Sequence, residues 1–160
     1  KLYLVSLIML LIAGCSTPKH FYSGPELSIN ERVTIWTPAA FLDIKKINDI
    51  GIVSDVLNLG DRVYAKAGKN TITVEVGGGD SSSWSSSGYS VTNTGVLRGK
   101  FSAELIAGHT YFLDSKGGRL TLRDLGTTFT LPEDSLLGSD EYYKVVDEAR
   151  TIGSPIRLYK

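Results

Sequence analysis

The stretch VLRGKFSAEL, residues 96–105, alternates between apolar or small residues and polar residues along its length. One set of alternating positions holds Leu97, Gly99, Phe101, Ala103 and Leu105, and the other holds Arg98, Lys100, Ser102 and Glu104. Successive side chains of a β-strand point to opposite faces, so this period of two predicts a strand with one buried and one wet face. The stretch therefore predicts one wall of a β-sheet core.

Similar alternation occurs along most of the chain. In NTITVEV, residues 70–76, we expect Ile72, Val74 and Val76 to point inward. Glycine-containing turn signals separate the short runs. Further strands are predicted at 32–36, 62–66, 110–114, 119–125 and 127–131. Many short strands joined by such turns favour a mainly β fold, an antiparallel sandwich or barrel.

Two segments have other patterns. Residues 41–53 fit neither period well, and we interpret them as two short strands about a turn at Asn48 and Asp49. Near the end, Ser139 or Asp140 can cap a short C-terminal helix. Its apolar positions at helical spacing are Tyr142, Val145, Val146 and Ala149, and Gly153 and Pro155 end it. The closing IRLYK, residues 156–160, is interpreted as a final strand.

The apolar segment Leu2–Ala13 is too short for a membrane-spanning helix, which needs roughly 20 residues. It fits the apolar region of a secretory signal, with Lys1 as the preceding positive charge. The segment ends at the only cysteine of the chain, Cys15, which Ser16 follows. An ordinary signal peptide with a buried free cysteine is the alternative interpretation.

Ile12-Ala13-Gly14-Cys15 resembles the lipobox of bacterial lipoproteins. The resemblance implies a diacylglycerol on the Cys15 thiol, cleavage just before Cys15 and acylation of the new amino group. It also implies outer-membrane sorting, because Asp is absent after the cysteine. We therefore expect a signal peptide at 1–14, a lipidated tether at 15–31 and a single domain at 32–160, since 160 residues argue for one domain.

The bulk composition excludes several classes of function. Lys and Arg number 17, as do Asp and Glu, so the chain lacks the basic excess of nucleic-acid binders. One cysteine forms no internal disulfide, and His20 and His109 lack the spacing of metal ligands. We expect no metal and no cofactor.

The segments AGKNTITV (67–74) and AGHTYFL (107–113) both place Ala-Gly and a basic or imidazole residue before a strand. This pattern resembles small bacterial lipoproteins with a transthyretin-like or immunoglobulin-like sandwich. The matching residues are Phe101, Ala103, Gly108, His109 and Tyr111. The likeness covers roughly residues 57–125, and Ala67 stands where those proteins have proline. It implies a β-sandwich and no particular activity.

Catalytic motifs do not emerge from the sequence. The region of Gly68 lacks the spacing of a phosphate-binding loop, and Gly77–Gly79 lacks that of a dinucleotide fingerprint. A Gly-x-Ser-x-Gly elbow is absent as well. His109 lies in a predicted turn, where an exposed structural histidine is the default. We therefore predict no enzyme and no catalytic residue.

The Gly/Ser-rich segment 77–95 joins two well-patterned strands. Long loops of this kind are flexible or functional, and three interpretations stay open. The loop could be a disordered hairpin tip, or Trp84 could cover an edge of the sandwich. Alternatively Trp84 and Tyr89 could form a contact loop, since such residues are favoured at binding surfaces.

The function expected from these features is a binding or assembly module of the bacterial cell envelope. Its lipid at Cys15 would hold it on the outer membrane facing the periplasm, with an envelope protein as partner. A sheet edge or the 77–95 loop would make the contact. The alternative is a periplasmic enzyme or enzyme inhibitor acting on cell-wall material. Finding His109 within hydrogen-bond reach of Asp or Glu in a deep pocket would reverse the preference between these two functions. A surface-exposed adhesive protein would use the same anchor.

Overall fold

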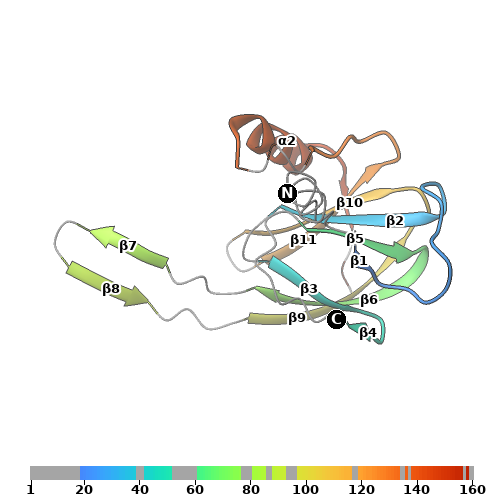
Figure 1. The fold of residues 1–160 in the computed structure, drawn as a ribbon, viewed down its shortest axis with the longest axis horizontal. Helices are drawn as coiled ribbons and strands as arrows, with labels where there is room; N and C mark the ends of the chain where they lie inside the picture. Colours follow the sequence, from blue (N-terminus) through green and yellow to red (C-terminus); the bar gives the residue numbers. More distant parts are fainter. Residues whose placement is uncertain are drawn as a thin grey trace, which may run out of the picture.

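The computed structural model describes residues 19–38, 42–51, 61–76, 81–85, 88–92, 97–116, 119–133, 136, 138–156 and 158. Two β-sheets pack as a sandwich, and the C-terminal helix lies against the outer face of the larger sheet (Figure 1). The prediction of a mainly β sandwich with one short C-terminal helix is confirmed.

The smaller sheet has the strand order β4-β3-β6-β9. Its strands are β3 (Leu42–Ile47), β4 (Ile50–Gly51), β6 (Gly68–Val76) and β9 (Leu97–Leu105). All three pairings are antiparallel. The two strands predicted within 41–53 are therefore present as β3 and β4. The turn between them contains Asn48, whose φ of 57° lies in the left-handed region that asparagine tolerates.

The larger sheet has the order β1-β5-β2-β10-β11-β12. Its strands are β1 (Lys19–His20), β2 (Arg32–Thr37), β5 (Asp61–Lys66), β10 (Thr110–Lys116), β11 (Arg119–Gly126) and β12 (Ser154–Pro155). The β1–β5 and β2–β10 pairings are parallel, and the others are antiparallel. This sheet is therefore mixed.

The main core fills the space between the sheets. Ile72 and Val74 of β6 are completely buried, and Phe101 of β9 is 4% exposed. The other buried members are Phe21, Val33, Ile35, Leu42, Ile44, Ile47, Val63, Ala65, Ala103, Leu105, Tyr111, Leu113 and Leu122. Burying one large apolar side chain contributes about 1.5–3 kcal/mol, so this core is the main stabilising feature.

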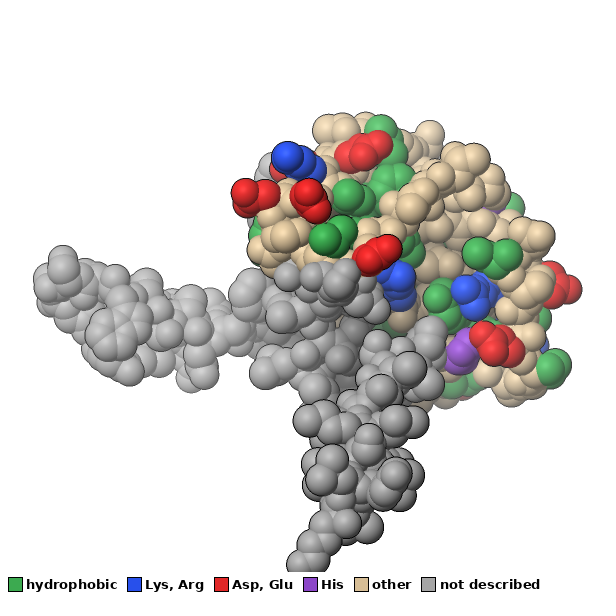
Figure 2. Space-filling view, turned by 45° about the horizontal axis from the view of Figure 1, so that its top comes forward, with side chains coloured by type: hydrophobic (Ala, Val, Ile, Leu, Met, Phe, Trp, Pro, Cys, Tyr) green, Lys and Arg blue, Asp and Glu red, His purple; other side chains and the backbone are tan. Residues whose placement is uncertain are grey.

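Helix α2 (Asp140–Thr151) buries the other face of the larger sheet. Its N-cap is Ser139, whose hydroxyl accepts a hydrogen bond from the backbone N–H of Tyr142 at 3.1 Å. A second core lies beneath the helix and consists of Trp36, Phe112, Leu125, Tyr142, Val146 and Ala149. The central strands β2 and β10 are therefore covered on both faces. Asp140 and Glu141 remain exposed on the first turn, and Figure 2 shows acidic side chains in the upper part of the body.

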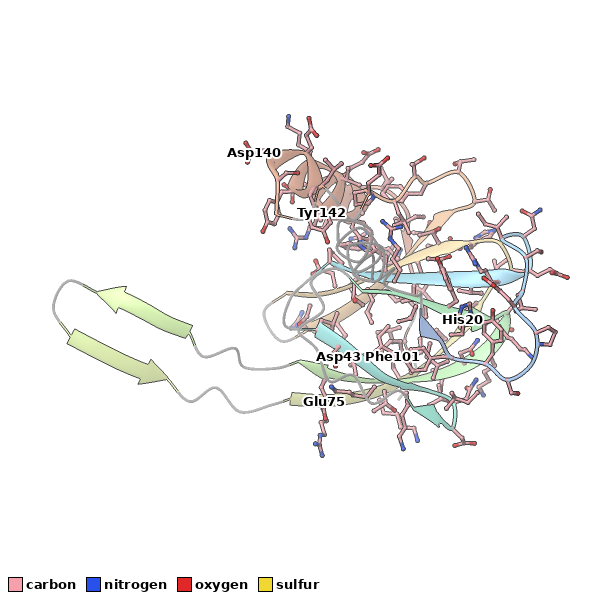
Figure 3. The ribbon with its side chains drawn as sticks, in the orientation of Figure 1. His20, Asp43, Glu75, Phe101, Asp140 and Tyr142 are labelled. Atoms are coloured by element: carbon pink, nitrogen blue, oxygen red, sulfur yellow. The ribbon has the colours of Figure 1, made fainter. Side chains whose placement is uncertain are left out.

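An ion-pair cluster lies on the outer face of the smaller sheet. Asp43 and Glu75 face each other in register across β3 and β6, and Figure 3 shows them near each other. The Lys45 ammonium pairs with Asp43 and lies 3.5 Å from Glu75, and Asp43 raises the pKa of Lys45 through a hydrogen bond. Arg98 of β9 pairs with Glu75 at 2.7 Å. This face is therefore polar, as the alternation predicts.

The structure corrects one predicted strand, and another lies largely outside the described residues. Residues 127–131 form no strand, because Gly126 turns the chain with a φ of 77° and Phe129 and Leu131 pack against the second core. In the closing segment a strand lies at Ser154–Pro155, and residues 157, 159 and 160 of the predicted strand 156–160 lie outside the described residues. Ile156 instead packs against the main core.

The structure also moves the boundary between tether and domain. We predict the domain to begin at residue 32, but β1 pairs with β5 and Phe21 is 2% exposed within the main core. The folded part therefore includes residues from Lys19 onward. A single large aromatic in a polar segment gives no periodicity, which is why the sequence pattern misses it.

Candidate contact sites

Strands β6 and β9 continue into a second pair of strands, β7 (Ser81–Ser85) and β8 (Gly88–Thr92). Val76 faces Leu97 at the end of the first pair, and Ser81 faces Thr92 at the start of the second. The intervening segments 77–80 and 93–96 are equal in length and lie outside the described residues. The register is therefore the same before and after them, and we name residues 68–105 the long hairpin.

Trp84 and Tyr89 lie directly opposite each other in the register of β7 and β8. Figure 1 shows the two-stranded ribbon of β7 and β8 extending away from the two packed sheets. The segment predicted as a loop thus contains two strands, and the contact role of Trp84 and Tyr89 stays a prediction.

His109 and Asp124 come together at the end of the larger sheet. His109 Nδ1 lies 2.9 and 3.0 Å from the two carboxylate oxygens of Asp124. A β-bulge in β11 places Asp124 opposite Tyr111 while Gly126 faces Thr110. The sequence places Asp124 in a strand but gives no sign of this contact, because His109 lies in the turn before β10 and Asp124 lies in β11.

The Asp124 carboxylate has further partners. The backbone N–H of Gly126 donates to it at 2.8 Å, and the Tyr111 hydroxyl also hydrogen-bonds to it. The side chain of His109 is 24% exposed, and that of Asp124 is 20% exposed. Among the described residues, no hydrogen bond joins His109 to a Ser, Thr or Cys side chain. The arrangement fits a structural contact between the start of β10 and the end of β11 better than a site that activates a nucleophile.

Tyr111 fastens the connection between β9 and β10. Its hydroxyl accepts a hydrogen bond at 2.8 Å from the backbone N–H of Ile106, five residues earlier. A tyrosine corner in immunoglobulin-like sandwiches uses the same type of bond, from a strand-start tyrosine back to the preceding connection. Burial raises the pKa of Tyr111 to about 12, and Asp124 adds to this shift.

Tyr111→Phe is expected to destabilise the chain by about 1–2 kcal/mol, because the Ile106 N–H loses its acceptor. The raised pKa of Tyr111 stabilises the fold below the ordinary tyrosine value of about 10, and this contribution is lost as pH rises toward about 12. Wild type should therefore lose more stability than Tyr111→Phe between pH 9 and pH 12 in urea unfolding. Tyr143→Phe, at a 58% exposed site, is the control. Equal losses in wild type and Tyr111→Phe would contradict this role.

His20 belongs to an aromatic group at the β1 edge of the larger sheet. Its Nδ1 lies 2.9 Å from the Tyr22 hydroxyl, and its ring packs near Tyr64. The Arg32 guanidinium lies 3.8 Å from the centre of the Tyr64 ring. These contacts hold the N-terminal segment against the sheet and give His20 a structural partner.

The described residues contain no cluster of His, Cys, Asp and Glu that could hold a metal ion. Within the same residues, no helix has the length and apolar character needed to span a membrane. Cys15, the predicted lipidation site, lies outside the described residues. Comparison of the chain with protein families, with curated proteins and with solved structures found no match.

Proposed function

We propose that this chain is a bacterial outer-membrane lipoprotein whose β-sandwich serves as a binding or assembly module in the cell envelope. The lipobox ending at Cys15 supports the anchor. Two or more acyl chains give stable membrane attachment, whereas one gives only marginal binding. The sandwich then stays at the membrane surface and faces the periplasm.

The early start of the fold shortens the proposed tether. Lys19 is already paired with Val63 in the larger sheet, only four residues after Cys15. A fully extended chain spans at most about 3.3–3.6 Å per residue, so Lys19 lies within about 14 Å of the lipidated cysteine. The proposed anchor therefore holds the sandwich next to the membrane.

The observation that carries the contact function is the pairing of β7 with β8 in the same register as β6 with β9. Its distal part, β7 and β8, pairs only as a two-stranded sheet. An isolated two-stranded ribbon is marginally stable in water and gains stability by packing against another surface. Trp84 and Tyr89 supply the residue types that dominate binding energy at interfaces.

Trp84→Ala is expected to lower the yield of crosslinked complexes in intact cells by about tenfold or more, because a central aromatic anchor is lost. The midpoint of thermal unfolding should stay within about 1 °C, since β7 and β8 pair as a sheet of their own. Tyr143→Ala removes an exposed aromatic residue from helix α2 and is the matched control. An unchanged crosslinking yield would remove Trp84 from the contact surface. A lower midpoint would assign it a covering role instead.

A periplasmic enzyme or enzyme inhibitor acting on cell-wall material is the second candidate, and the contact between His109 and Asp124 favours it. We rank it second because Asp124 already binds Gly126 and Tyr111. Turnover of peptidoglycan that His109→Gln abolishes, in a variant with an unchanged unfolding midpoint, would reverse this order.

A further inference from the structure

Strand β9 forms a long edge of the smaller sheet. It has nine residues and pairs with β6 on one side, and no described strand pairs with its other side. In the two packed sheets, the other edge strands β1, β4 and β12 have two residues each. Natural proteins shorten or cover edge strands because unpaired backbone groups attract another strand. The length of β9 therefore sets it apart.

The backbone groups at this edge can be identified. The backbone N–H of Asn48, next to β3, donates to the Thr71 carbonyl at 2.7 Å. The backbone N–H and C=O of Thr71 therefore point toward β3. The direction of the backbone N–H and C=O groups alternates along a strand. Those of Ile72 therefore point toward β9, where its register partner is Phe101. Phe101 and every second residue from it therefore bind β6. The residues whose backbone groups face the free edge are Arg98, Lys100, Ser102 and Glu104.

The side chains of β9 have a charge pattern that suits pairing with itself. Arg98 and Glu104 lie three residues on either side of Phe101. Both are exposed, and both belong to the outer face of the sheet. When two β9 strands run antiparallel about a twofold axis at Phe101, Arg98 of each copy lies opposite Glu104 of the other. Opposite charges facing each other across strands stabilise a pair, and like charges destabilise it.

Only one register pairs these opposite charges and also gives hydrogen-bond partners to all the backbone groups at the free edge of β9. With the axis at Phe101, Arg98 pairs with Glu104 and Lys100 pairs with Ser102, so all four free-edge residues of each copy are used. Moving the axis to Ser102 leaves Arg98 outside the strand pairing, and moving it to Lys100 places Lys100 against itself. The charges thus select the register with the most hydrogen bonds.

We propose that two copies of this chain associate through antiparallel pairing of β9 with β9, centred on Phe101. The two smaller sheets then form one continuous sheet, with both inner faces on the same side. The interface is isologous, as in most homodimers. The proposal goes beyond the contact function of the ribbon, because it uses the sheet edge and a second copy as partner.

Sedimentation equilibrium of the full chain in detergent micelles tests this interface. Wild type should form dimers, and Glu104→Arg should weaken dimerisation by at least about tenfold, because two attractive pairs become repulsive. Arg98→Glu should weaken it similarly. The double variant Arg98→Glu/Glu104→Arg should restore it, since the opposite charges are exchanged. Glu75 lies beside Arg98, so the unfolding midpoint of each variant is measured in parallel.

Three results would overturn the proposal. One is a wild-type chain that stays monomeric at every concentration. Another is dimerisation that both single charge reversals leave unchanged, which would place the interface elsewhere. A double variant that dimerises no better than the single variants, with an unfolding midpoint equal to theirs, would likewise exclude the register centred on Phe101.

Discussion

Replacing Trp36 with alanine is expected to lower the free energy of unfolding by about 3–5 kcal/mol, the range for large aromatic residues removed from a core. Trp36 is 1% exposed. Its ring lies 5.4 Å from that of Phe112 in the sheet and 6.1 Å from that of Tyr142 in helix α2. The indole therefore joins the helix to the sheet, and its loss leaves a cavity between them.

Two further measurements make this prediction specific. Trp36→Phe keeps a ring at the site, so it should cost clearly less than alanine in urea unfolding. Hydrogen exchange in Trp36→Ala should increase first in residues 140–151, because the helix depends on the second core. A loss below about 1 kcal/mol, or exchange that rises equally in both sheets, would show that the helix is held by other contacts.

Gly153→Ala is expected to destabilise the chain by about 3 kcal/mol, from the sum of backbone strain and a steric clash. Gly153 has a φ of 81°, in the left-handed region. An added Cβ would lie 2.4 Å from the carbonyl oxygen of Asp124, a backbone atom that cannot move without disturbing β11. The substitution would also loosen the pairing of Ser154 with Asp124.

Gly138→Ala separates the two contributions. Gly138 has a φ of 80°, but nothing lies within 4 Å of an added Cβ. It should therefore cost only the backbone strain, about 1 kcal/mol. Equal losses of unfolding free energy in the two variants would show that β12 yields to the clash, so that the end of the chain is only loosely attached to β11.

Alternation allowed the sequence to predict the sheets, and burial explains where it failed. Ile72 and Val74 lie on the buried face of the smaller sheet. The other face is exposed to water and carries polar residues, so the period of two is visible in the sequence. Trp36 and Phe112 lie on the face of the larger sheet that helix α2 covers. Strands buried on both faces lose the alternation, so the sequence gives no sign that the helix packs there.

The candidate site was predictable only in part, because it depends on contacts between distant residues. The aromatic residues Trp84 and Tyr89 were visible, but their pairing rests on equal segment lengths on the two sides of the long hairpin. The bond between His109 and Asp124 depends on a bulge in β11, which has no reliable sequence signal. The buried side chain of Asn70 was also unexpected, because its amide oxygen accepts a hydrogen bond from Asn48, 22 residues earlier.

The proposed lipid anchor at Cys15 is tested most directly by labelling growing cells with an alkyne analogue of palmitate. The account predicts that the wild-type chain carries the label and sediments with membranes. Cys15→Ala, which removes the only cysteine, should carry no label. A wild-type chain recovered without label, with a free thiol and in the aqueous fraction, would contradict the anchor and the envelope function proposed from it.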